Sequence, residues 1–216
     1  MQKVLLSVAT AAALTFASFS AGAVTQQGAF IAVNGGKSHF DVSHSYFDDN
    51  NDTAFGATAG YRWVVDRPFS LGVEVGYANL GKQTAQRGNI QLVDVPITTD
   101  TRYKFKTQAI MVGANGKWDL PHGFTITARA GIAHSRSTFD VTSTTTSSHG
   151  TSSEWGSEDS NDNGVYGGLG FGYDFNENFG ITLTYDHFAV KAQDITNDKR
   201  TVNIGVTGAN LEYRFW

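Results

Sequence analysis

The chain has 216 residues, a formal net charge of −4, no cysteine and only three prolines, and the scarcity of proline suits long paired strands. The slightly acidic balance argues against a nucleic-acid partner, because such proteins carry strongly basic surfaces. No stretch of residues 24–216 holds 18 consecutive apolar residues, which excludes a membrane protein built from helices.

Residues 1–23 have the three parts of a secretory signal peptide. Lys3 supplies the positive region, residues 4–19 supply the apolar region, and Ala21-Gly22-Ala23 is a cleavage motif of small residues. The sequence therefore predicts a signal peptide over residues 1–23, with Ala21 and Ala23 as the cleavage residues. It predicts a single domain over residues 24–216.

After the signal peptide, apolar residues recur at every second position. In residues 54–63, Phe55, Tyr61 and Trp63 share one face, whereas Arg62 shares the other with small residues. Similar alternation covers, in chain order, residues 28–38 (more weakly), 69–78, 110–118, 124–133, 165–173, 179–186 and 211–215. A strand tilted across a bilayer needs about 9–11 residues and shows alternate side chains to lipid and lumen. The pattern therefore predicts eight transmembrane strands.

The last of these stretches is irregular. Leu211, Tyr213 and Phe215 occupy one phase, but the valines and isoleucine of residues 202–206 occupy the other. A slip of one residue moves every side chain to the opposite face, and a β-bulge produces such a slip. We therefore predict a bulge near Thr207-Gly208.

The connections between the stretches alternate in length. Short ones cover residues 65–68, 119–123 and 176–178, and long ones cover 39–52, 79–103, 136–163 and 190–199. Aromatic residues flank the short connections, as in an interfacial girdle, and outer-membrane barrels place short turns in the periplasm. We predict an all-β fold, an eight-stranded antiparallel up-and-down transmembrane β-barrel. A soluble β-sandwich, the alternative, would have short turns at both ends.

Three segments carry a family resemblance: residues 71–77 (Leu-Gly-Val-Glu-Val-Gly-Tyr), Arg129-Ala130-Gly131 and the terminal Tyr213-Arg214-Phe215. They resemble the transmembrane domain of outer membrane protein A and, more broadly, the small outer-membrane barrels that include OmpX and Ail. The resemblance implies a bacterial outer-membrane location, and assembly by the barrel-assembly machinery with Tyr213 and Phe215 as the signal. Family members end on phenylalanine, whereas this chain adds Trp216.

The resemblance also implies ion pairs inside the barrel. Glu74 and Arg129 match two interior family residues, whereas Asn115 replaces a lysine and Gly172 a glutamate. From their phase, seven charged residues are expected to form a polar network in the lumen: Arg62, Glu74, Lys117, Arg129, Asp186, Glu212 and Arg214. Eight strands leave only enough room for side chains, so we expect a polar plug. A proton or ion pathway is the alternative.

Catalytic signals are weak. His187-Phe188-Ala189 is similar to the His-x-Ser of lipid A deacylase barrels, but alanine replaces the nucleophile. Ser135 directly follows His134, and neighbouring residues of a strand face opposite sides, which prevents a hydrogen-bonded pair. We expect no enzyme activity, no catalytic residues, no cofactor and no metal site.

The long loops hold most of the remaining chemistry. Residues 136–163 are rich in serine, threonine and acidic residues, a composition typical of a mobile segment, and Trp155 is a candidate contact with a surface ligand. Loop 79–103 and the start of the next strand carry Lys82, Arg87, Arg102, Lys104 and Lys106. These cations are placed to meet lipopolysaccharide phosphates.

The predicted function is a structural and surface-interaction role, in membrane integrity and adhesion, through four long extracellular loops. The expected partners are outer-membrane lipid, lipopolysaccharide and a host or environmental surface ligand, and we expect a monomer. Two alternatives remain open: a narrow channel or carrier for small solutes, and a lipid-modifying enzyme.

Overall fold

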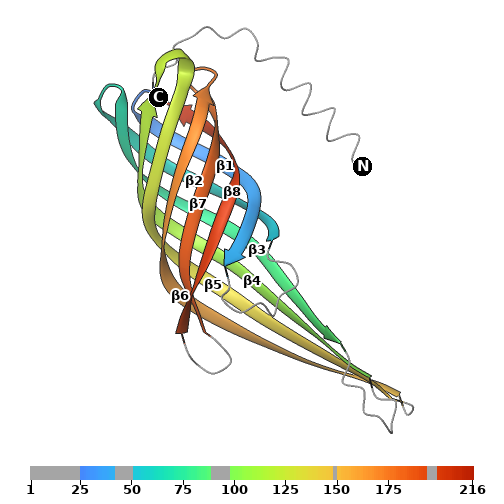
Figure 1. Cartoon of the computed structure of the whole chain (residues 1–216). Helices are drawn as coiled ribbons and strands as arrows, with labels where there is room; N and C mark the ends of the chain where they lie inside the picture. The colour runs from blue at the N-terminus through green and yellow to red at the C-terminus, as the bar shows by residue number, and fades with distance from the viewer. Residues whose placement is uncertain (1–24, 42–50, 89–97, 148–149, 194–198) are drawn as a thin grey trace, which may run out of the picture.

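The described residues form a single closed ring of eight antiparallel strands (Figure 1). The computed structural model describes residues 25–41, 51–88, 98–147, 150–193 and 199–216, so the predicted signal peptide lies outside it. The strands are β1 (Gly28–Asp41), β2 (Asn51–Asp66), β3 (Phe69–Gly88), β4 (Thr98–Asp119), β5 (Phe124–Ser147), β6 (Gly150–Asp174), β7 (Phe179–Gln193) and β8 (Lys199–Phe215). Each pairs with its neighbours in sequence, and β1 closes the ring against β8. The predicted fold class is confirmed.

Short turns gather at one end of the barrel, which we call the short-turn end. They follow β2, β4 and β6, and the one after β4 contains a 3-10 turn at Pro121–Gly123. Among the described residues, no helix is long and apolar enough to span a membrane. The N-terminal segment is tied to this end, because Thr25 donates hydrogen bonds from its backbone nitrogen and its hydroxyl to the Asp119 carboxylate, each at 2.7 Å.

The outside of the barrel carries an apolar belt. Ile31, Val73, Val112, Ile132 and Leu183 are among its members, and each has more than half of its surface exposed. Exposed apolar side chains on adjacent strands of a closed ring have lipid as their natural environment. Aromatic residues border the belt at the short-turn end, where the Phe69 and Trp118 ring centroids lie 4.2 Å apart.

Strand β8 contains no bulge, so that prediction is wrong. Its pairing with β1 runs without a shift from Phe215 to Asn203, and its pairing with β7 is equally continuous. Leu211 faces outward, whereas Ile204 is fully buried inside the barrel. The change of phase in the sequence therefore marks a change in which side of the strand is apolar.

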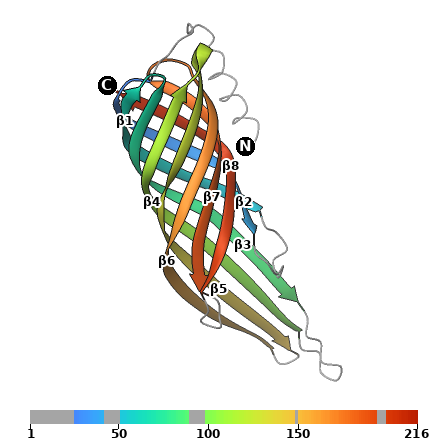
Figure 2. The same ribbon diagram turned by 60° about the vertical axis from the view of Figure 1, so that its left-hand side comes forward.

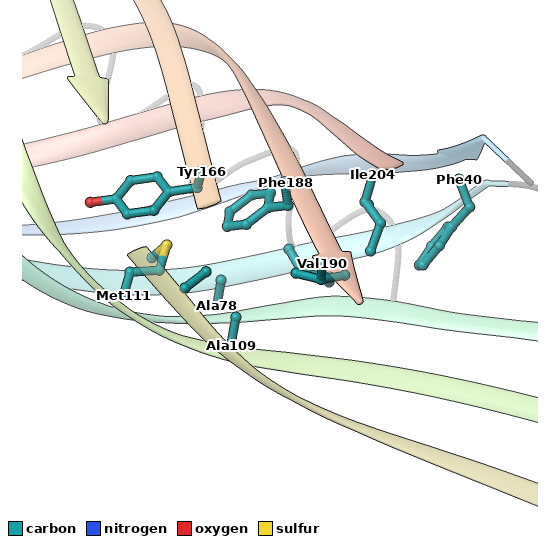
Figure 3. Packing of buried hydrophobic residues seen from close by; sticks show 10 residues of the cluster. Phe40, Ala78, Ala109, Met111, Tyr166, Phe188, Val190 and Ile204 are labelled. Atoms are coloured by element: carbon teal, nitrogen blue, oxygen red, sulfur yellow. The ribbon is translucent and has the colours of Figure 1, made fainter. Parts of the chain in front are cut away.

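An apolar cluster explains that change. Toward the end opposite the short turns, the inward side chains of β1 and β3–β8 pack together across the lumen (Figure 3). The cluster comprises Phe40, Ala78, Leu80, Ala109, Met111, Ala133, Tyr166, Phe188, Val190 and Ile204. At this level outward apolar residues such as Ile110 and Val165 give way to polar ones, among them His134 and His187. The barrel is thus apolar outside and polar inside near the short turns, and the reverse beyond them.

A bulge does occur, but in β3. The pairing of β3 with β4 shifts between Asn79 and Lys82. Gly81 adopts a positive φ of 93° there, which costs glycine less than any other residue. The extra residue lets Leu80 and Gln83 both point inward, while Lys82 is exposed.

Four strands continue beyond the ring as a projecting sheet, formed by the distal parts of β3, β4, β5 and β6 (Figures 1 and 2). The prediction of a loop over residues 136–163 is therefore wrong. β5 and β6 remain paired from Arg136 opposite Asn161 to Ser147 opposite Gly150. Serine and threonine pairs line the sheet, such as Thr107 with Ser137 at 3.2 Å. Threonine is favourable in strands, which the composition argument for a mobile loop neglected.

Candidate functional site

The lumen near the short turns contains a layer of buried charges centred on Glu212. Its carboxylate accepts two hydrogen bonds from the Arg62 guanidinium, both at 2.9 Å. Arg62 also donates from Nε to Asn115 Oδ1 at 2.7 Å, and its guanidinium carbon lies 4.3 Å from the Phe30 ring centre. Asn115 therefore accepts a hydrogen bond from Arg62 at the position where the family resemblance implies a lysine.

Asp174 completes this layer and was missed by the sequence analysis. It accepts hydrogen bonds from Lys117 at 2.8 Å and from Arg214 at 2.6 Å. Both cations also lie 3.6 Å from Glu212. Asp174 continues the inward phase of Gly168, Gly170 and Gly172 in strand β6. Extending this alternation by one step predicts that Asp174 faces the lumen.

A second layer lies farther from the short turns and is centred on Arg129. Its Nε donates to Asp186 Oδ1 at 2.7 Å, and its Nη1 lies 3.9 Å from Glu74 Oε1. Glu74 accepts a closer hydrogen bond from the Tyr166 hydroxyl, at 2.7 Å. The structure thus brings Glu74 and Arg129 together, but the main partner of Arg129 is Asp186. Tyr166 joins this layer to the apolar cluster.

The two layers are electrically balanced and leave little space. They hold four basic residues, namely Arg62, Lys117, Arg129 and Arg214, against four acidic ones, namely Glu74, Asp174, Asp186 and Glu212. A cavity of about 40 Å³ remains among them, which is room for a few water molecules. Together with the apolar cluster, the layers fill the lumen.

The predicted assembly residues lie on the outer surface at the short-turn end. Tyr213 and Phe215 are exposed on the same face of β8, and their ring centroids are 4.8 Å apart. Trp216 follows the end of the strand. The predicted cleavage residues Ala21 and Ala23 lie outside the described residues.

Trp155 lies on the distal part of β6, with 83% of its surface exposed. Here β6 pairs with β5 alone, because its pairing with β7 begins only at Val165. Residues 150–161 therefore form an edge that pairs with no strand on its far side in the described part of the chain; we call it the β6 edge. Unpaired backbone groups along an edge are ready to pair with another strand.

Exposed cations lie on the outer face of the sheet just beyond the apolar belt. Lys82 on β3 stands directly opposite Lys106 on β4, and Lys104 is the next residue on the same face. Arg136 on β5 lies nearby but is paired, donating to Asp159 at 2.6 Å. This hydrogen bond lowers the pKa of the Asp159 carboxyl.

The residues weighed for catalysis lie apart. His134 faces outward and contacts Asn163 at 2.8 Å, whereas Ser135 is buried and donates to the Asp162 carbonyl. His187 is exposed on the outside of β7. No group of three or more His, Cys, Asp or Glu residues placed to hold a metal ion occurs in the part of the chain that the structure describes.

A closed ring of strands with an apolar exterior and a filled lumen defines a small transmembrane β-barrel. A family model of the outer membrane protein β-barrel domain matches residues 9–215. The chain therefore belongs to the outer membrane protein β-barrel domain family, and it is a protein of the bacterial outer membrane. No curated protein sequence matches it.

Solved structures that are similar to this chain include the following three. Ail, the attachment invasion locus protein of Yersinia pestis, is 17% identical, with 88% of this chain and 100% of that chain covered and a TM-score of 0.46. Neisserial surface protein A is 14% identical, with 91% and 99% covered and a TM-score of 0.45. The outer membrane protease OmpT from Escherichia coli is 11% identical, with 93% and 100% covered and a TM-score of 0.44.

Proposed function

We propose that this protein is a non-enzymatic surface-interaction protein of the outer membrane, in which a closed barrel anchors a sheet that meets ligands outside the cell. The β6 edge is the observation that carries this proposal. Within the described residues, it offers a strand edge without a neighbour over residues 150–161 and an exposed aromatic side chain, Trp155. A free edge binds extended segments of other proteins by adding them to the sheet.

The filled lumen supports an anchoring role over a channel or carrier. The ion-pair layers and the apolar cluster occupy successive levels along the barrel axis, and the cavity between the charges is only about 40 Å³. A rigid barrel of this kind holds the sheet at a fixed orientation. The outward position of His134 and the inward position of Ser135 favour a role without acyl-transfer chemistry.

Shortening the sheet tests the proposal. Phe139 and Glu158 stand opposite each other, so replacing residues 140–157 with Asn-Gly closes the hairpin by a two-residue turn. We expect this variant to assemble normally, shown by heat-modifiable migration on a gel. Bacteria that display it should bind host-cell monolayers and matrix-coated surfaces less than bacteria that display the full chain.

Single substitutions refine this test. Trp155→Ala should reproduce part of the loss, because it removes the exposed ring and leaves the backbone edge intact. Thr142→Ala, which changes the residue directly opposite Trp155, is the matched control and should leave binding unchanged. Normal assembly of the shortened variant with undiminished binding would contradict the proposal.

A second candidate function concerns the exposed lysines. Like charges directly opposite each other destabilise a sheet, yet Lys82 faces Lys106 with Lys104 beside them. We propose that lipopolysaccharide phosphates neutralise this triad. Thermal unfolding in vesicles with and without lipopolysaccharide tests this: lipopolysaccharide should stabilise the native chain more than a variant with all three lysines changed to glutamine. Equal stabilisation of both would exclude the triad.

A further inference from the structure

The two faces of the β6 edge differ in chemistry. On one face, Glu154, Gly156 and Glu158 follow one another at alternate positions. Their opposite residues on β5 are Ser143, Val141 and Phe139, and directly opposite residues lie on the same face of a sheet. A strand added to this edge would therefore place every second side chain beside this Glu-Gly-Glu row.

Among the described residues, the two glutamates have no basic partner. Residues 150–161 contain three acidic residues and no lysine or arginine. Asp159 is paired with Arg136 and Thr138, but within the described residues neither Glu154 nor Glu158 forms an ion pair. Both are exposed. Such charges on an edge repel a second acidic strand, so a β6 edge from another copy of this chain is a poor partner.

Between the glutamates the row is open and apolar. A side chain at Gly156 would meet no atom within 4 Å. The neighbouring residue on β5 is Val141, and next to it on β4 is Tyr103, whose ring centroid lies 5.9 Å from that of Phe139. An incoming side chain opposite Gly156 would thus rest on an apolar surface with a carboxylate on either side.

We propose that the partner of the β6 edge is an extended basic polypeptide that pairs with it as an added strand. Lysine or arginine at positions i and i+4 would lie opposite Glu158 and Glu154, and an apolar residue at i+2 would lie opposite Gly156. Backbone hydrogen bonds supply affinity in this mode, and alternate side chains supply selectivity. The long stems of the basic residues would cover apolar surface while their charged ends reach the carboxylates. This inference rests on the proposed binding role of the edge.

Peptide binding to the full chain in nanodiscs tests the inference. The matched peptide has the pattern Lys-x-Ile-x-Lys with threonine at the x positions. The control has the same composition with both lysines moved by one residue, which places them on the opposite face. By fluorescence anisotropy we expect the matched peptide to bind about tenfold more tightly, as two exposed ion pairs allow. Raising the salt concentration should reduce this difference.

Variants of the chain assign the selectivity to the two carboxylates. Glu154→Gln combined with Glu158→Gln should lower the affinity for the matched peptide to that of the control. Glu177→Gln, at an exposed glutamate of the short-turn end, should change nothing. Replacing residues 140–157 with Asn-Gly should abolish binding of both peptides.

Each result separates the inference from the function on which it rests. If both peptides bind equally and the shortened variant binds neither, the edge binds strands but the preference for basic partners is overturned. If neither peptide binds the full chain while displayed cells still lose adhesion on shortening, the inference fails and the proposed function stands. A dimer of the native chain that excludes the matched peptide would overturn the inference in favour of a second copy as the partner.

Discussion

Glu212 is the residue on which most of the first lumen layer depends. It holds Arg62 through two hydrogen bonds and lies 3.6 Å from both Lys117 and Arg214. Without its charge, Arg62 would lose the carboxylate to which it donates, whereas Lys117 and Arg214 would keep Asp174 as a partner. Removing one member of a buried ion pair is costly, because the remaining charge stays in a medium that solvates it poorly.

Glu212→Gln should therefore destabilise the barrel by about 3 kcal/mol. The measurement is the free energy of unfolding in urea, with the protein refolded into lipid vesicles. Glu177→Gln is the matched control, since this exposed glutamate donates no charge to the lumen and should cost at most about 1 kcal/mol. Equal, small losses in both variants would show that the layer is hydrated well enough to tolerate an unpaired cation.

Arg129 permits a comparison of two acidic partners. It lies 2.7 Å from Asp186 and 3.9 Å from Glu74. Double-mutant cycles with Arg129→Met should give a larger coupling energy with Asp186→Asn than with Glu74→Gln, because coupling grows with contact. Coupling of about 1–3 kcal/mol is expected for the first pair. A larger value for Glu74 would contradict the observed order of distances.

The sequence identified which residues face the lumen but not how they pair. Phase alone places Arg62, Glu74 and Glu212 inside, because the period of a strand is two. Pairing depends on the register around the whole ring: Arg62 on β2 meets Glu212 on β8 across β1. Family resemblance suggested Glu74 as the partner of Arg129, and the structure adds the closer Asp186. The apolar alternation of strand β6 stops at Tyr173, which hides Asp174 although Asp174 shares the inward phase.

At the scale of the strands, the alternation of apolar residues predicts all eight strands but not how far they extend away from the short turns. Strand β8 was assigned a bulge because its apolar phase changes. That prediction assumed that apolar side chains face lipid throughout, whereas Ile204 packs inside the barrel. The richness of residues 136–163 in serine, threonine and acidic residues predicts a loop, although cross-strand pairs of serine and threonine can sustain a hairpin.

The bulge in β3 gives a prediction at this scale. Gly81→Val should destabilise the barrel by about 1–3 kcal/mol, because a β-branched residue is strained at φ 93° and its Cβ would lie 2.9 Å from Asp52 Cβ. Gly35→Val is the control, since no atom lies within 4 Å of the added Cβ and the backbone there has no positive φ. Thermal unfolding in detergent micelles measures both. Similar losses would mean that the positive φ carries no particular cost.

For the whole molecule, the order of layers along the lumen predicts its electrical behaviour. An ion must pass two layers of paired charges and then the apolar cluster formed by residues such as Phe188 and Ile204. We expect neither to leave a continuous column of water, because eight strands enclose only enough room for side chains. Purified protein in planar bilayers should therefore show no discrete conductance steps, under conditions in which a large porin conducts. Reproducible nanosiemens steps would favour the channel alternative.

The exchange of polar and apolar faces along the strands also fixes the depth at which the barrel sits in the bilayer. On the short-turn side of this level, Ile132 and Tyr185 face outward; past it come His134 and His187 on the same strands. Sinking the barrel deeper would carry imidazoles and lysines toward hydrocarbon, at a cost that rises to about 2–4 kcal/mol for a lysine at mid-bilayer. Raising it would expose the apolar belt to water. The level at which the outward residues change from apolar to polar thus marks the edge of the hydrocarbon layer. The projecting sheet therefore starts at a fixed distance from the lipid.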